Sequence, residues 1–282
     1  MELKELDPEP VAHYRPVEGI EKPSGILNWL NPRILRISLR KIQKYSVWPF
    51  AAYFPLHAIN TLIVPAISPE GAPNDVLMMV RELLPGFTST LLSASVAAHL
   101  ASGVALRIWS LVANWRRPKR AKNRVQDSAE RESQREIGLV GGLSGYFIGV
   151  TKQLSYNPQI LTGYILAPAI FYHTYLMKKA PLQEGIDIDF DFVKWILQND
   201  SKFIKWWIGI IPLSALIWTA SYHFGAGLCQ YARIRRLSVR KSMSTLILGL
   251  TSMGLVGLWR LSKTTSVFYN SDYQRILNAV IR

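Results

Sequence analysis

Five runs of about 20 apolar residues constrain this chain more than any other feature of its sequence. Each run is long enough to cross the roughly 30 Å hydrocarbon core of a bilayer as an α-helix. A helix also satisfies its own backbone hydrogen bonds, which lipid cannot do. The runs cover residues 46–68, 87–112, 158–177, 206–229 and 245–261. The sequence therefore predicts an all-α membrane protein with five transmembrane helices.

Polar segments between and around the runs complete the predicted organisation. Residues 1–45 form a disordered arm, and its last part, 26–45, has the pattern of a basic amphipathic helix at a membrane surface. Residues 113–157 form a charged loop that includes an apolar, glycine-rich stretch, 137–150, too short to span. Residues 262–282 are predicted to be a short polar tail.

The distribution of lysine and arginine predicts the orientation. The arm carries 8 of them, the 113–157 loop 9, and the connection between the fourth and fifth runs 5. The other two connections carry 1 and 5, and the C-terminal tail together with Arg260 just before it carries 4. The positive-inside rule then places the N-terminus and both basic loops in the cytosol. The net charge of +14 has this membrane explanation, so it gives no reason to expect nucleic-acid binding.

Two of the runs share a histidine and a glycine four residues apart. His99 and Gly103 lie in the second run, and His223 and Gly227 lie in the fourth. At this spacing both groups lie on one face of a helix.

The two preceding runs match each other as well, and each carries its own histidine. In the first copy, Ser46 follows Gln43 by 3 residues and His57 follows Ser46 by 11. In the second copy, Gln159, Thr162 and His173 have the same two spacings. The sequence thus predicts a duplicated two-helix unit, 46–112 and 158–229, with the helix 245–261 added. Both copies enter the membrane from the same side, as in parallel repeats related by an axis along the membrane normal.

The four histidines fall at two depths. His99 and His223 lie nearer the cytosolic side, while His57 and His173 lie nearer the far leaflet. Two histidine pairs at two depths suit two bis-histidine haems of the b type. The arrangement resembles the five-helix dihaem cytochrome b subunits of fumarate reductases, and it implies electron transfer as one function.

A second interpretation assigns the histidines to a buried polar layer without any cofactor. Each would donate a hydrogen bond across a helix interface packed by Gly103 and Gly227, worth about 0.6 kcal/mol. Both interpretations are compatible with the residues.

Other chemistry has little support. Cys229 is the single cysteine, so neither an internal disulfide nor a cysteine metal cluster is possible. We find no nucleophile–base pair and no cluster of metal ligands, so we do not expect an enzyme or a resident metal ion. A transporter is a further class, but nothing in the sequence specifies its ligand.

The start of the arm carries a short motif. Leu3 and Leu6 lead into Pro8 and Pro10, followed by Val11. Pro-x-Pro holds an extended backbone that loses little entropy when it docks into an apolar groove. The alternative is a disordered leader with chance prolines.

Four features together resemble the fungal Mdm-ten-complementing protein family. They are the Pro-x-Pro arm, Gln43-Lys44-Tyr45-Ser46 leading into Pro49-Phe50, His57-Ala-Ile-Asn60, and the duplicated five-helix body. The resemblance implies a multispan protein of the mitochondrial outer membrane. It also implies that Leu3, Leu6, Pro8 and Pro10 recruit the bridge-like lipid-transfer protein vacuolar-protein-sorting-thirteen.

The implied role is an adaptor for vacuole–mitochondrion contacts that supports mitochondrial lipid homeostasis. A bridge protein delivers lipid to one leaflet only, so the receiving membrane needs a route between leaflets. We therefore expect the body to scramble phospholipids as well, without ATP because the sequence has no phosphate-binding loop.

Overall fold

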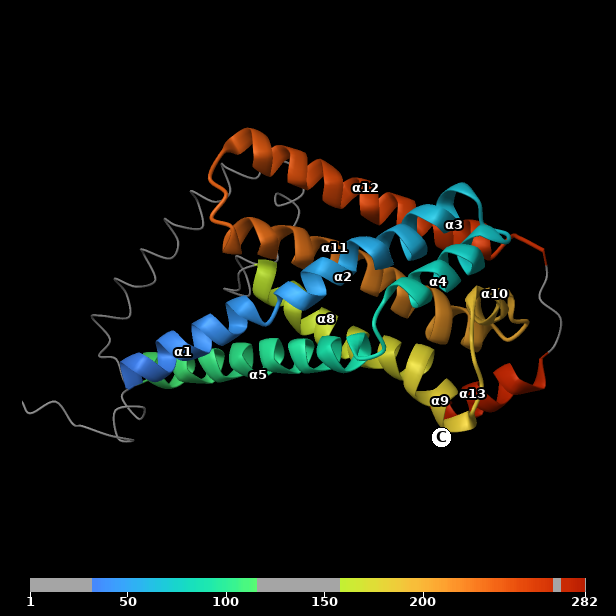
Figure 1. Ribbon diagram of the computed structural model, residues 1–282, viewed down its shortest axis with the longest axis horizontal. Helices are drawn as coiled ribbons and strands as arrows, with labels where there is room; N and C mark the ends of the chain where they lie inside the picture. The colour runs from blue at the N-terminus through green and yellow to red at the C-terminus, as the bar shows by residue number, and fades with distance from the viewer. Residues whose placement is uncertain (1–31, 116–157, 266–269, 282) are drawn as a thin grey trace, which may run out of the picture.

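The computed structural model describes residues 32–115, 158–265 and 270–281, which form helices joined by short turns, with no β-strand among them (Figure 1). Five of its helices are long and apolar enough to cross a membrane, which confirms the predicted number of spans. The Leu3–Pro10 motif and most of the 113–157 loop, including 137–150, lie outside the described residues.

The first span is part of a helix that begins earlier than the predicted residue 46. It comprises α1 (Pro32–Tyr45), α2 (Trp48–Ala58), the π-helical turn η2 (Ile59–Ile63) and α3 (Val64–Ile67). The basic, amphipathic α1 lies along α5 (Thr88–Trp115), which is the second span (Figure 1).

The second half of the chain follows the same plan. Its first span comprises α8 (Pro158–Thr174), the π-helical turn η3 (Tyr175–Lys179) and α9 (Ala180–Glu184). Its second comprises the π-helical turn η4 (Ile204–Ile210) and α11 (Ile211–Tyr231), and α11 packs along α8. The fifth span, α12 (Leu237–Leu261), packs against α11, η2 and α3.

Each π-helical turn in the described part of the chain ends two residues before a proline, namely Pro65, Pro181 or Pro212. Proline has no backbone N–H, and its ring clashes with the carbonyl four residues earlier. A local widening to i→i+5 bonds gives the displaced carbonyls other partners. One such carbonyl, that of Ile208 four residues before Pro212, accepts from the Tyr172 hydroxyl at 2.9 Å. Helical structure therefore continues through these prolines.

One end of the bundle is covered by short helices, and we call this end the cap. It consists of α4 (Ala72–Leu83), α9, α10 (Phe190–Gln198) and α13 (Ser271–Ile281) (Figure 1). Its apolar core also includes side chains of η3 and η4. The core residues are Leu176, Ala180, Phe192, Trp195, Ile196, Ile208, Tyr273, Ile276 and Leu277. The predicted polar tail thus contains a helix, α13, whose inner face is buried.

Charge is divided unevenly between the two ends. We call the end opposite the cap the basic end; it contains α1, the C-terminus of α5 and the turn between α11 and α12 (Figure 1). The basic residues described there are Arg33, Arg36, Arg40, Lys41, Lys44, Arg107, Arg233, Arg235, Arg236, Arg240 and Lys241. Every aspartate and glutamate of the described residues lies at the cap, from Glu70 to Asp272.

Candidate functional site

The four histidines of the spans meet in two pairs, each joining the two halves of the chain. His57 of α2 and His173 of α8 have ring centroids 6.1 Å apart, with an angle of 69° between the ring planes. The hydroxyl of Tyr53 lies 3.2 Å from Nδ1 of His57. Nδ1 of His173 is buried and has no hydrogen-bond partner among the described residues.

The second pair is formed by His99 of α5 and His223 of α11, with ring centroids 6.3 Å apart and planes at 83°. Nδ1 of His99 lies 2.9 Å from the carbonyl oxygen of Gln43. A carbonyl can only accept a hydrogen bond, so this Nδ1 carries the hydrogen.

Nδ1 of His223 is placed in a similar way by α8. It lies 3.4 Å from the hydroxyl oxygen of Thr162, and that hydroxyl is also within donating distance of the carbonyl oxygens of Pro158 and Gln159, at 3.0 and 3.1 Å. Because both carbonyl oxygens are closer to the hydroxyl than His223 is, we assign its one hydrogen to a carbonyl and the hydroxyl as the acceptor from His223. Nδ1 of His223 therefore carries the hydrogen as well.

The predicted glycines lie beside these histidines at equivalent contacts in the two halves. A Cβ added at Gly103 would meet Nε2 of Gln43 at 3.0 Å, and one added at Gly227 would meet Nε2 of Gln159 at 3.0 Å. The Gln159 amide also donates to the carbonyl oxygen of His223 at 2.8 Å. The two glycines therefore leave room for a glutamine side chain from the facing helix.

All four histidines are half-buried. No group of three or more metal-ligating side chains occurs among the described residues, so each histidine pair has no carboxylate or cysteine to complete a tetrahedral metal site. The pairs offer imidazole nitrogens in an apolar setting and nothing that resembles a nucleophile with its base.

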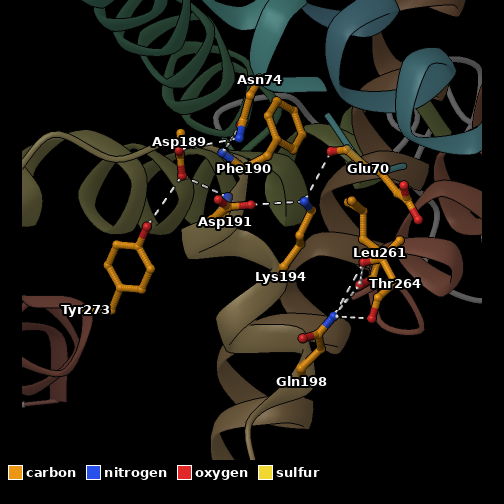
Figure 2. Close-up of polar contacts among 10 residues, drawn as sticks. All are labelled: Glu70, Asn74, Asp189, Phe190, Asp191, Lys194, Gln198, Leu261, Thr264 and Tyr273. Atoms are coloured by element: carbon orange, nitrogen blue, oxygen red, sulfur yellow. Dashed lines mark hydrogen bonds and ion pairs between the residues drawn. The ribbon is translucent and has the colours of Figure 1, made fainter. Parts of the chain in front are cut away.

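The cap contains a second polar cluster, shown in Figure 2. Asp189 caps the N-terminus of α10 by accepting from the Asp191 backbone N–H at 2.9 Å, and the Asn74 side chain accepts from the Phe190 N–H at 2.8 Å. The nearly buried Lys194 bonds Asp191 at 3.0 Å and donates to the carbonyl oxygen of Glu70 at 3.1 Å. These contacts tie α10 to the start of α4.

The C-terminal helix is held to the same cluster. The hydroxyl of Tyr273 donates to Asp189 at 3.5 Å (Figure 2). Burial, followed by the negative charges of Asp189 and Asp191, raises the pKa of Tyr273 to about 12. Each polar group here is satisfied by another part of the chain, so we assign the cluster a structural role.

Comparison with known proteins identifies the family. The chain matches the MDM10-complementing protein 1 transmembrane domain over residues 52–155 and 168–265. It is 43% identical to the mitochondrial adapter protein MCP1 of Saccharomyces cerevisiae, over 94% of this chain and 92% of that protein. The chain belongs to the MDM10-complementing protein 1 family. This membership confirms the resemblance noted from the sequence, and no solved structure matches the chain.

The two matched segments of the MDM10-complementing protein 1 family begin at residues 52 and 168. These two starts are separated by the same number of residues as His57 and His173. The name of this relative describes an adapter protein of mitochondria. Sequence reasoning missed the cap cluster, although Asp189 before an apolar stretch is a typical helix start.

Proposed function

We propose that this chain is an adaptor of the mitochondrial outer membrane that recruits a vacuolar-protein-sorting-thirteen-type lipid-transfer protein. It would thereby promote vacuole–mitochondrion contacts and mitochondrial lipid homeostasis. The observation that carries the proposal is the 43% identity, over almost the whole chain, to a protein named as a mitochondrial adapter. An adaptor needs a membrane body and an accessible binding segment, and the five spans supply the body.

The binding segment we assign is the motif formed by Leu3, Leu6, Pro8 and Pro10, with Val11 following. Prolines restrict the free segment to extended conformations, so docking into a groove costs less entropy. The leucines offer apolar side chains for that groove.

The charge division supports an orientation in which this segment faces the cytosol. The arm is continuous with α1, which lies at the basic end, whereas all described carboxylates lie at the cap. Membrane proteins retain such basic ends in the cytosol. The same side chains attract anionic lipid head groups, at about 1 kcal/mol per residue near the surface.

A pulldown tests the adaptor proposal. The full chain in detergent is immobilised and incubated with the isolated adaptor-binding domain of a vacuolar-protein-sorting-thirteen protein. We expect the variant Pro8→Ala/Pro10→Ala to lose at least tenfold in affinity. The matched control is Pro16→Ala/Pro23→Ala, which removes two prolines of the same arm outside the motif. Equal binding by both variants, or no binding by the unaltered chain, would contradict the proposal.

The body is also proposed to scramble phospholipids, because several hydroxyl side chains of the spans are exposed where lipid surrounds them. Thr90 and Ser93 are exposed on α5, and Ser242, Thr245 and Ser252 are exposed on α12. Ser93, Ser242 and Thr245 donate to carbonyls of their own helices, so their oxygens still have acceptor capacity for head groups. Exposed hydroxyl oxygens on a span lower the cost of moving a head group along that helix through the bilayer.

Liposomes with fluorescent lipid in both leaflets test scrambling independently of the adaptor role. Dithionite should bleach the inner-leaflet lipid in liposomes that contain the chain, without added ATP. The variant Ser93→Ala/Ser242→Ala/Thr245→Ala should slow the bleaching. Inner-leaflet lipid that stays fully protected at several chains per liposome would refute the scrambling proposal and leave the adaptor proposal intact.

A further inference from the structure

We infer that the two histidine pairs are the axial ligand pairs of two haems of the b type, one held by His57 and His173 and the other by His99 and His223. The inference goes beyond the adaptor function and does not depend on it. Such a haem has both axial positions filled by protein, so it is suited to one-electron transfer rather than gas binding.

The separation of the rings is the first argument. A metal–imidazole bond is about 2.0 Å long, and the ring centroid lies about 1.1 Å behind the ligating nitrogen, so two imidazoles on one iron have centroids about 6.2 Å apart. The two pairs have centroid separations of 6.1 and 6.3 Å. A direct hydrogen bond of about 2.9 Å between the rings would bring the centroids to about 5.1 Å instead. Both pairs therefore have the spacing of ligands and not of hydrogen-bonded partners.

The hydrogen positions are the second argument. Nδ1 of His99 donates to a carbonyl, and Nδ1 of His223 donates to the Thr162 hydroxyl. In a neutral imidazole the other nitrogen, Nε2, then has a free lone pair. Two lone pairs cannot hydrogen-bond to each other, but they can bind the same metal ion. A metal-ligating histidine usually has its second nitrogen fixed by a carbonyl or hydroxyl in this way.

The small number of ligands is the third argument. Each site has two histidines and no further metal-ligating group among the described residues. Two imidazoles are too few for a structural zinc site, which takes four ligands. They are sufficient for an iron whose other four bonds come from a porphyrin.

The two pairs also lie at different levels of the bundle. Thr162 contacts His223 of one pair, and His173 of the other pair lies 11 residues further along the same helical span, about 16 Å at 1.5 Å per residue. Each haem would therefore lie at its own depth in the bundle, as in proteins that pass electrons across a membrane from one haem to the next.

Absorption spectroscopy of the full-length protein, produced in cells supplied with haem precursor, tests the inference. We expect a Soret band, two b-type haems per chain by the pyridine haemochromogen assay, and a reduced spectrum unchanged by carbon monoxide. The near-perpendicular ring planes predict a highly anisotropic low-spin ferric signal in electron paramagnetic resonance.

Variants assign each haem to its pair. His99→Ala and His223→Ala should each lose half of the haem, as should His57→Ala and His173→Ala, while the control His13→Ala, in the arm, should lose none. The retained haem reports that a variant still folds. In His223→Gly, added imidazole should restore the low-spin spectrum. Absence of any Soret band, or equal haem content in all five variants, would overturn the inference.

Discussion

The fifth span is held by a glycine face on α12, and a pair of alanine variants on this helix tests that packing. A Cβ added at Gly254 would lie 2.8 Å from Cγ2 of Ile217 and 2.9 Å from Cδ2 of Leu62. Real Cβ atoms do not approach carbon this closely. Leu62 can turn its methyl away, but Cγ2 of Ile217 is a branch at the stiff Cβ, so α12 must move.

Gly249 of the same helix provides the matched control, because a Cβ there meets nothing within 4 Å. Both changes gain the same helix propensity, about 1 kcal/mol for glycine to alanine, so this gain cancels in the comparison. Overpacking typically costs about 1–3 kcal/mol. We therefore expect Gly254→Ala to be less stable than Gly249→Ala by this amount, about a 5- to 150-fold difference in the unfolding equilibrium constant.

Unfolding in mixed micelles of increasing sodium dodecyl sulfate content, followed by the fluorescence of the 9 tryptophans, measures the difference. A lower transition midpoint for Gly254→Ala than for Gly249→Ala is expected. Coincident transitions would show that α12 does not pack closely through Gly254, and the argument from the added Cβ would fail.

Three further predictions concern the cap and its link to α3. Leu277→Ala removes a fully buried side chain and should lower the free energy of unfolding of the cap by about 2–5 kcal/mol. An epitope tag at the C-terminus should then be lost faster under protease treatment. Ile281→Ala changes an exposed position and should leave the tag as resistant as in the unaltered chain. The pKa of Tyr273 is raised to about 12, above the usual tyrosine value of 10. Its contribution to stability is therefore complete below pH 10 and is lost as the pH rises through about 12. Tyr273→Phe should remove this alkaline loss of stability in a fluorescence titration. Arg260 donates to the carbonyl oxygens of Ala66 and Ile67 at 2.6 and 2.9 Å, and Arg260→Lys, which cannot reach both, should lower the detergent midpoint by the equivalent of about 1 kcal/mol.

The spans could be predicted from the sequence because lipid imposes a length and a composition that leave a strong local signal. The grouping of His57 with His173 and of His99 with His223 could also be predicted, since a repeat fixes which positions lie at equal depth. The structure brings these same pairs within 6.1 and 6.3 Å. The distance between paired rings depends on helix rotation and tilt, which the sequence pattern does not determine.

The cap escaped prediction because its helices are short and depend on one another. The helix α10 has nine residues, and Phe192 and Ile196 are fully buried in a core shared with η3, η4, α9 and α13. Tertiary packing, rather than propensity, stabilises helices of this length. Within this segment the charge of Lys194 is met by Asp191 and by the Glu70 carbonyl, a contact distant in sequence that only the folded chain provides.

Each close ring pair joins a histidine to its own counterpart in the other half of the chain. In a symmetric dimer, a residue can touch its own copy only on the twofold axis. A half-length ancestor with one copy of each histidine would therefore have formed both pairs simply by dimerising, with each subunit contributing one ring to each pair. Fusion of the two genes would then have fixed this self-association within one chain and freed the halves to diverge. The counterparts His99 and His223 show such divergence, because one contacts the Gln43 carbonyl and the other the Thr162 hydroxyl.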